Sequence, residues 1–229
     1  VTLTATSMSG ATFAGWSGGG CSGTGVCTFT VGSPVSVDAN FTLNGYTLSV
    51  SKAGTGNQLG TVTSSPIGIN CGLDCSEGYT FGQSVTLSAT AASGATFTGW
   101  SGGGCGGLGA CITTINADTA ITATFTLDSY TLAVVRAGNA AAAGTVTSAP
   151  TGITCSPSMN DCDQSYVFDT MVTLTAAPGA GSTFGGWSGG GCAGTGSCIV
   201  TMNAAKTVTA TFTLDEALTV TRAGNGAGF

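Results

Sequence analysis

Residues 97–105 read Phe-Thr-Gly-Trp-Ser-Gly-Gly-Gly-Cys, and this stretch recurs with one changed residue at 13–21 and at 184–192. Each copy is followed six residues later by a second cysteine, at Cys27, Cys111 and Cys198. Fourteen residues further on, each copy reaches Phe-Thr-Leu, at Phe41, Phe125 and Phe212. Three copies in one register define a repeat, and the repeat therefore sets the domain organisation of this 229-residue chain.

The repeat is out of phase with the two ends of the sequence. Matching tryptophans lie 84 and then 87 residues apart, and the three extra residues fall between Cys155 and Cys162, where a loop accommodates them. We expect residues 1–43 to be the C-terminal half of a module. Two complete modules at 44–127 and 128–214 then follow, and 215–229 is the first strand of a further module.

The apolar residues of each module alternate with threonine and serine, as in Val85-Thr-Leu-Ser-Ala89 and in Ile121-Thr-Ala-Thr-Phe125. A period of two is typical of strands that bury one face. Threonine, valine and glycine disfavour helix, and no window has helical periodicity. The sequence predicts an all-β chain with about five strands per module and little or no helix, arranged as a tandem array of small modules.

The ten cysteines form five close pairs, which indicates an oxidising compartment and local disulfides. The pairs are Cys21/Cys27, Cys71/Cys75, Cys105/Cys111, Cys155/Cys162 and Cys192/Cys198. A four-thiolate zinc site within one module is the alternative. Low charge, the absence of histidine and the self-contained pair in residues 1–43 favour disulfides. The connectivity within a module stays open, because four cysteines allow three pairings.

Charge is sparse and acidic, with four basic residues, ten acidic residues and a net charge of −6. No basic patch is available to neutralise a phosphate backbone, so we expect no nucleic-acid partner. No stretch of about 20 apolar residues predicts insertion into a membrane. The Ser-Gly-Gly-Gly stretches are not phosphate loops, because neither Lys-Ser nor Lys-Thr follows them. No cofactor is expected.

The tryptophans and the acidic residues are the candidates for binding. Exposed indoles at Trp16, Trp100 and Trp187 could stack on a sugar ring and form a surface-binding loop, but we favour a core role beside the neighbouring cysteines. Asp161, Asp163 and Asp169 could hold calcium, although a solvated loop is the simpler interpretation. The chain has no histidine for general base catalysis, and we expect no enzymatic activity.

Several stretches together resemble the divergent internalin B-type repeat family of bacterial surface and secreted proteins. They are Gly-Thr-Val-Thr-Ser from Gly60, Gly-Ile-Asn-Cys ending at Cys71, Ser-Val-Thr-Leu-Ser-Ala from Ser84, the Gly-Trp-Ser-Gly-Gly-Gly-Cys loop and Thr-Ala-Thr-Phe ending at Phe125. The resemblance covers essentially the whole chain. It implies a β-grasp-like sheet module that serves as a stalk or spacer outside the cell, without catalytic residues to transfer.

Two functions follow as expectations. The first is an extracellular or cell-surface rod, stalk or filament of end-to-end modules, linked head to tail when the strand at Ala217, Leu218, Thr219, Val220, Thr221 and Arg222 completes residues 1–43 of another subunit. The second is an adhesin, a module that binds glycan or a cell surface, or a spacer in a larger secreted protein. The sequence is equally compatible with a piece of a longer repeat chain.

Overall fold

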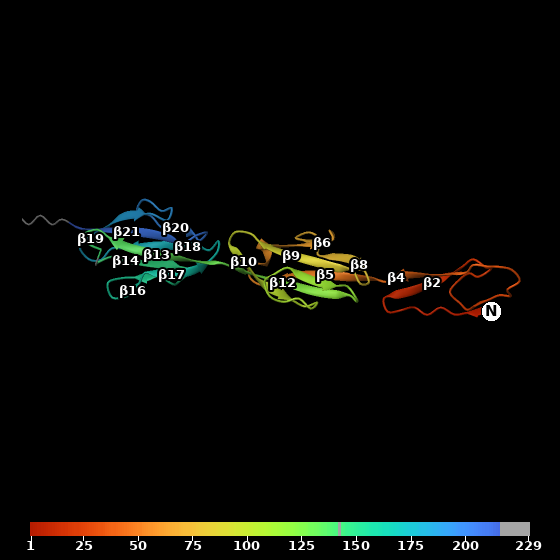
Figure 1. Ribbon diagram of the computed structural model, residues 1–229. Helices are drawn as coiled ribbons and strands as arrows, with labels where there is room; N and C mark the ends of the chain where they lie inside the picture. Colours follow the sequence, from red (N-terminus) through yellow and green to blue (C-terminus); the bar gives the residue numbers. More distant parts are fainter. Residues whose placement is uncertain (142, 216–229) are drawn as a thin grey trace, which may run out of the picture. The chain divides into compact units, whose positions relative to one another are not determined.

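The computed structural model describes residues 1–141 and 143–215, and these residues form an all-β chain. The single helical element among them is a 3-10 turn, η1 (Asn57–Leu59). Figure 1 draws the strands of residues 1–141 and 143–215 as arrows. The expected all-β fold is therefore confirmed. None of the helical structure within the described residues is long and apolar enough to cross a membrane.

Residues 44–127 fold into two four-stranded sheets. The first has the order β10 (Ala95–Ser101), β12 (Thr119–Leu127), β5 (Gly45–Ala53) and β8 (Ser76–Thr80). The second has the order β11 (Cys111–Thr114), β9 (Ser84–Ala91), β6 (Gly60–Ser65) and β7 (Asn70–Cys71). β12 and β5, the central pair of the first sheet, run parallel, and the other pairs are antiparallel.

The repeat from residue 128 onward has the same plan. Its first sheet contains β17 (Asp163–Val167), β13 (Ser129–Ala137), β21 (Lys206–Leu214) and β19 (Ser182–Ser188), again with a parallel central pair. Its second sheet contains β16 (Asn160–Asp161), β15 (Thr154–Cys155), β14 (Thr145–Ala149), β18 (Met171–Ala177) and β20 (Cys198–Thr201). In 44–127 the counterpart of β16 is only an isolated β-bridge between Asn70 and Asp74. β16 lies in the longer Cys155–Cys162 loop.

Each complete repeat has its own apolar core between its two sheets. In 44–127, the fully buried side chains Leu48 and Phe125 come from the first sheet, and Val62, Val85 and Leu87 come from the second. The core of the next repeat is built from the matching positions, such as Leu132, Val146 and Phe212. The alternation in the sequence thus predicts which residues face inward.

The number of strands differs from the expectation. We expected about five per module, whereas 44–127 contains eight. β7, β15 and β16 have only two residues each, and the other additional strands are short edges of a sheet. A run of two to five residues contains too few alternations to be recognised from its pattern.

Residues 1–43 contain the second half of this plan. β2 (Ala11–Ser17) pairs with β4 (Asp38–Leu43), and β1 (Thr2–Leu3) pairs with β3 (Cys27–Thr28). The contacts between residues divide the chain into two compact units, Val1–Leu127 and the residues from Asp128 onward. The module boundaries at 43/44, 127/128 and 214/215 stay predictions.

Candidate functional site

The three tryptophans are buried, and their indole nitrogens are occupied. Nε1 of Trp16, Trp100 and Trp187 donates a hydrogen bond of 2.7 Å to the carbonyl of the glycine nine residues ahead, at Gly25, Gly109 and Gly196. Each indole also packs edge to face with the phenylalanine three residues before it. A buried indole offers no face to a sugar ring, so a surface-binding loop centred on the tryptophans does not agree with this geometry.

The glycines after each tryptophan let the loop pack tightly over the first sheet. Gly103 has φ +55°, and a Cβ there would lie 2.6 Å from Cγ1 of Ile121. Gly104 also has a positive φ, yet its Cβ position has open space around it. The Gly-Gly-Gly run is therefore a backbone requirement of the fold, as expected for a turn.

The structure joins each cysteine to its close neighbour in the sequence. The five disulfides are Cys21–Cys27, Cys71–Cys75, Cys105–Cys111, Cys155–Cys162 and Cys192–Cys198. In this arrangement no thiolate is left for a zinc site among these ten residues. Within residues 1–141 and 143–215, no group of three acidic, cysteine or histidine side chains is placed to hold a metal ion.

Lys52 and Arg136 occupy matching positions, each before Ala-Gly, and their side chains bond across the turn between two strands. Nζ of Lys52 donates to the carbonyl of Gly60, and Nη1 of Arg136 donates to the carbonyls of Ala141 and Gly144. These bonds tie the end of β5 to the start of β6, and β13 to the segment that leads into β14. The position is thus structural in both complete repeats.

Residues 1–43 expose side chains whose counterparts form the core of the complete repeats. Val1, Val31 and Phe41 are 63%, 56% and 46% exposed, whereas their counterparts Val85, Ile115 and Phe125 are 0% exposed. Ala39 is also exposed, although its counterpart Ala123 is fully buried. We call Val1, Val31, Ala39 and Phe41 the open face.

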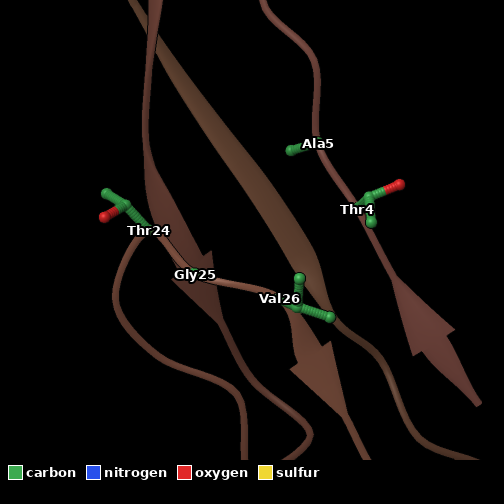
Figure 2. Close-up of a pocket in the computed structure, with 5 residues that line it drawn as sticks. All are labelled: Thr4, Ala5, Thr24, Gly25 and Val26. Carbon is green, nitrogen blue, oxygen red and sulfur yellow. The ribbon is translucent and has the colours of Figure 1, made fainter.

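Two shallow pockets lie in this half-module. Thr6, Met8, Ala11 and Phe41 line an apolar one. Thr4, Ala5, Thr24, Gly25 and Val26 line the other, in which Ala5 points toward the 24–26 segment and Thr4 points away from it (Figure 2). Ala89, the counterpart of Ala5, pairs with Val62 of β6 and packs against the core of 44–127. The pockets therefore lie where a complete repeat has further strands.

The expectation that residues 1–43 are half a module did not identify the residues of the open face, because Val1, Val31 and Phe41 look like ordinary core residues of a strand pattern. Aligning them with Val85, Ile115 and Phe125 could have identified them. In a complete repeat, the strands that pair beside these positions come earlier in the sequence. The expected inter-subunit strand, Ala217–Arg222, lies outside the described residues.

A second feature that the sequence did not reveal is the joint between residues 1–43 and the next repeat. The Asn44 backbone N–H donates to the carbonyl of Gly10, and its carbonyl accepts from the N–H of Phe81. Its side-chain Oδ1 accepts from the hydroxyl of Thr12. Asp215 makes two of these contacts within its own repeat. Its backbone N–H donates to the carbonyl of Gly181, and its side-chain Oδ1 accepts from the hydroxyl of Thr183.

Several solved structures of bacterial proteins share low sequence identity with this chain. The Bacillus anthracis TIE protein is 7% identical with a TM-score of 0.44, covering 79% of this chain and 38% of that one. The major pilin of Streptococcus pyogenes is 11% identical with a TM-score of 0.35, covering 75% and 97%. A C-terminal fragment of the pilus adhesin SpaC from Lactobacillus rhamnosus GG is 13% identical with a TM-score of 0.35, covering 77% and 100%.

No curated protein matches the chain. A family model does match it, in three tandem segments at residues 1–45, 46–129 and 130–216. These segments follow the repeat of the tryptophan loop, the disulfides and the two-sheet plan described above. Since they cover nearly the whole sequence, the chain belongs to the divergent InlB B-repeat domain family.

Proposed function

We propose that this chain is a non-enzymatic structural segment of an extracellular rod, stalk or filament on a bacterial surface, built from repeats that follow one another end to end. The observation that carries the proposal is the joint between repeats. A single residue connects β4 to β5, and a single residue connects β12 to β13. Within the unit Val1–Leu127, the one-residue connection at Asn44 leaves no room for a flexible linker.

The Asn44 joint is held by both of its neighbours. Gly10 and Thr12 bind it from one side and Phe81 from the other. A Cβ at Gly10, which has φ +80°, would collide with the ring of Phe81, so these two residues lie in close contact. These contacts on both sides of Asn44 support a role as a stalk or fibre.

The disulfides and the composition support a durable protein outside the cell. Every repeat carries short-range disulfides, which persist in oxidising compartments. Charged residues are only 6% of the chain, so its stability depends little on ion pairs that salt would screen. The absence of histidine argues for a role without acid–base catalysis.

The finer part of the proposal is self-association through the open face. Covering three half-exposed apolar side chains would contribute roughly 3 kcal/mol at the usual value per unit of buried apolar area. Electron microscopy and light scattering of the purified chain over a range of concentrations test this part. We expect polymers with this chain as the repeating subunit; discrete monomers at every concentration would refute it.

A role in adhesion is the second candidate, because two apolar side chains project almost fully into solvent. Ile67 and Leu73 are 97% and 98% exposed, in the loops on either side of β7. An adhesive contact there predicts that Leu73→Asp abolishes binding to a cell surface or glycan array without changing the stability of the fold. The exposed Thr61→Asp on β6 is the control, and equal binding by both variants would argue against this candidate.

A further inference from the structure

The first and last long strands of each complete repeat lie side by side and run in the same direction (Figure 1). In 44–127 the chain enters through β5 and leaves through β12, and the two pair in parallel over six residue pairs. In the next repeat it enters through β13 and leaves through β21, which also pair in parallel over six residue pairs. The strands that lead into and out of a repeat are therefore direct neighbours.

A stretching force along the backbone acts on this pair from opposite ends. In 44–127 the force pulls on the start of β5, at Gly45, and on the end of β12, at Leu127. Because the strands are parallel, these two points lie at opposite ends of the pair, and the strands separate only by sliding past each other. The hydrogen bonds between them then share the force and break together. A pair pulled from one end would lose its bonds one after another.

Two further hydrogen bonds extend the contact between these strands beyond the paired residues. Before the paired stretch, the backbone N–H of Thr47 donates to Oδ1 of Asp118 over 2.8 Å. After it, the backbone N–H of Leu127 donates to Oγ1 of Thr55 over 3.0 Å. Both bonds join the entering part of the chain to the leaving part, so a sliding movement has to break them too.

We propose that each complete repeat bears tensile load, and that the parallel pair of its entering and leaving strands is the structure that resists it. We call β5/β12 and β13/β21 the load-bearing pairs. The inference rests on the proposed stalk or fibre, because such a segment is pulled at both ends. Neither Cys71–Cys75 nor Cys105–Cys111 joins β5 to β12, so hydrogen bonds and packing hold this pair together.

The two complete repeats differ in the side chains that support their load-bearing pairs. The counterpart of Asp118 is Ala205, which has no carboxylate to accept from the backbone of β13. The hydroxyls of Ser51 and Thr122 share a hydrogen bond of 2.8 Å across β5 and β12, whereas the counterpart of Ser51 is Val135. We therefore expect the repeat from residue 128 onward to unfold at the lower force.

Single-molecule force spectroscopy of the full chain, held at its two ends, tests the proposal. We expect two separate unfolding steps, one for each complete repeat. The disulfides identify the steps, because they close loops with sequence separations of 4 and 6 in the first repeat and 7 and 6 in the second. At about 3.5 Å per extended residue, less the span of each bridge, reduction should lengthen the first repeat's step by roughly 25 Å and the second's by roughly 35 Å.

The direction of loading provides a matched control within the same chain. Attachment at Gly45 and Ser129 loads β5 and β12 from opposite ends, whereas attachment at Gly45 and Ala117 loads them from the same end. All three residues are exposed and accept a handle for attachment. At a given force, 44–127 should unfold roughly tenfold or more faster in the second geometry, because its bonds then break singly. Equal rates in the two geometries would overturn the proposal.

Two substitutions separate mechanical resistance from equilibrium stability. Asp118→Ala removes the bond to Thr47 and introduces the residue that the next repeat has at this position. It should raise the unfolding rate of 44–127 at a given force by about fivefold, the factor expected for one hydrogen bond. Gln83→Ala is the control, because Oε1 of Gln83 accepts from the N–H of Thr80 in the turn between β8 and β9, outside the load-bearing pair.

Gln83→Ala should leave the unfolding rate under force unchanged, although chemical denaturation should show a similar loss of equilibrium stability for both variants. Equal effects of the two substitutions on the rate under force would overturn the proposal. Chains that form filaments under the electron microscope, yet unfold at the same force in both loading geometries, would overturn the load-bearing pair and leave the structural role in place. Monomeric chains that respond to the loading direction and to Asp118→Ala would support the pair and refute the self-association.

Discussion

At the scale of single residues, the repeat is explained by a few side chains with several roles each. The indole of Trp100 is buried in the core and packs against Phe97. Its Nε1 donates a hydrogen bond to the carbonyl of Gly109. The small residues that follow it bring the loop against Ile121. The burial, the hydrogen bond and the ring contact of Trp100 favour a role in the core over sugar binding.

Trp100→Ala should destabilise the 44–127 repeat by about 3–5 kcal/mol, because it removes a buried aromatic side chain and leaves the Gly109 carbonyl without its donor. Chemical denaturation followed by circular dichroism measures the loss. Thr98→Ala, at an exposed position on the same strand, should cost less than about 1 kcal/mol. A similar small effect for both variants would contradict the assigned core role.

Gly103→Ala should destabilise more than Gly104→Ala, by about 1–3 kcal/mol. Both residues have a positive φ, so the backbone strain of an added Cβ is common to the two variants. Only the Cβ at 103 collides, with Ile121 and Thr119. Equal midpoints in the same denaturation experiment would show that the loop relaxes to accept the methyl group.

At the scale of elements, the parallel central pair is the feature on which the fold depends. β5 is the first strand of its repeat and β12 the last, and they lie side by side in the first sheet. A repeat is therefore closed only when its two ends meet. Among the described residues β4 pairs with β2 alone, and its inward positions Ala39 and Phe41 are exposed.

Backbone amides of β4 should exchange with deuterium roughly tenfold or more faster than those of β12 in the monomeric chain, because β12 is bonded on both sides and β4 on one. Hydrogen exchange read by mass spectrometry measures both strands in one sample. β21 serves as a second two-sided reference. Equally slow exchange in the two strands would contradict the one-sided pairing of β4.

At the scale of the whole molecule, stability resides in separate repeat cores. The buried clusters of 44–127 and of the repeat from 128 onward share no residue. Each includes residues of both its sheets and contacts its own disulfides. This organisation suits a protein whose length grows by adding modules, each of which folds on its own core.

A chain of residues 44–127 should therefore fold alone, with a cooperative thermal transition and the near-ultraviolet circular dichroism expected of a packed Trp100. The disulfide-bonded form should melt above the reduced form, since each short bridge contributes about 2 kcal/mol in the chain-entropy model. Residues 1–43 alone should show neither property, because their core side chains are exposed. Cooperative folding of 1–43 would contradict this account of the open face.

The repeat, the all-β class, the inward-facing residues and the family could be predicted from the amino-acid sequence, because they depend on local composition and on a period of two. The burial of Trp100, the pairing of β5 with β12 and the different exposure of Phe41 and Phe125 became known from the fold. Those facts depend on which strands meet across the sheet, and strands far apart in the sequence meet through contacts that no local pattern records. The short edge strands escaped prediction for the same reason, since their neighbours rather than their own residues hold them in place.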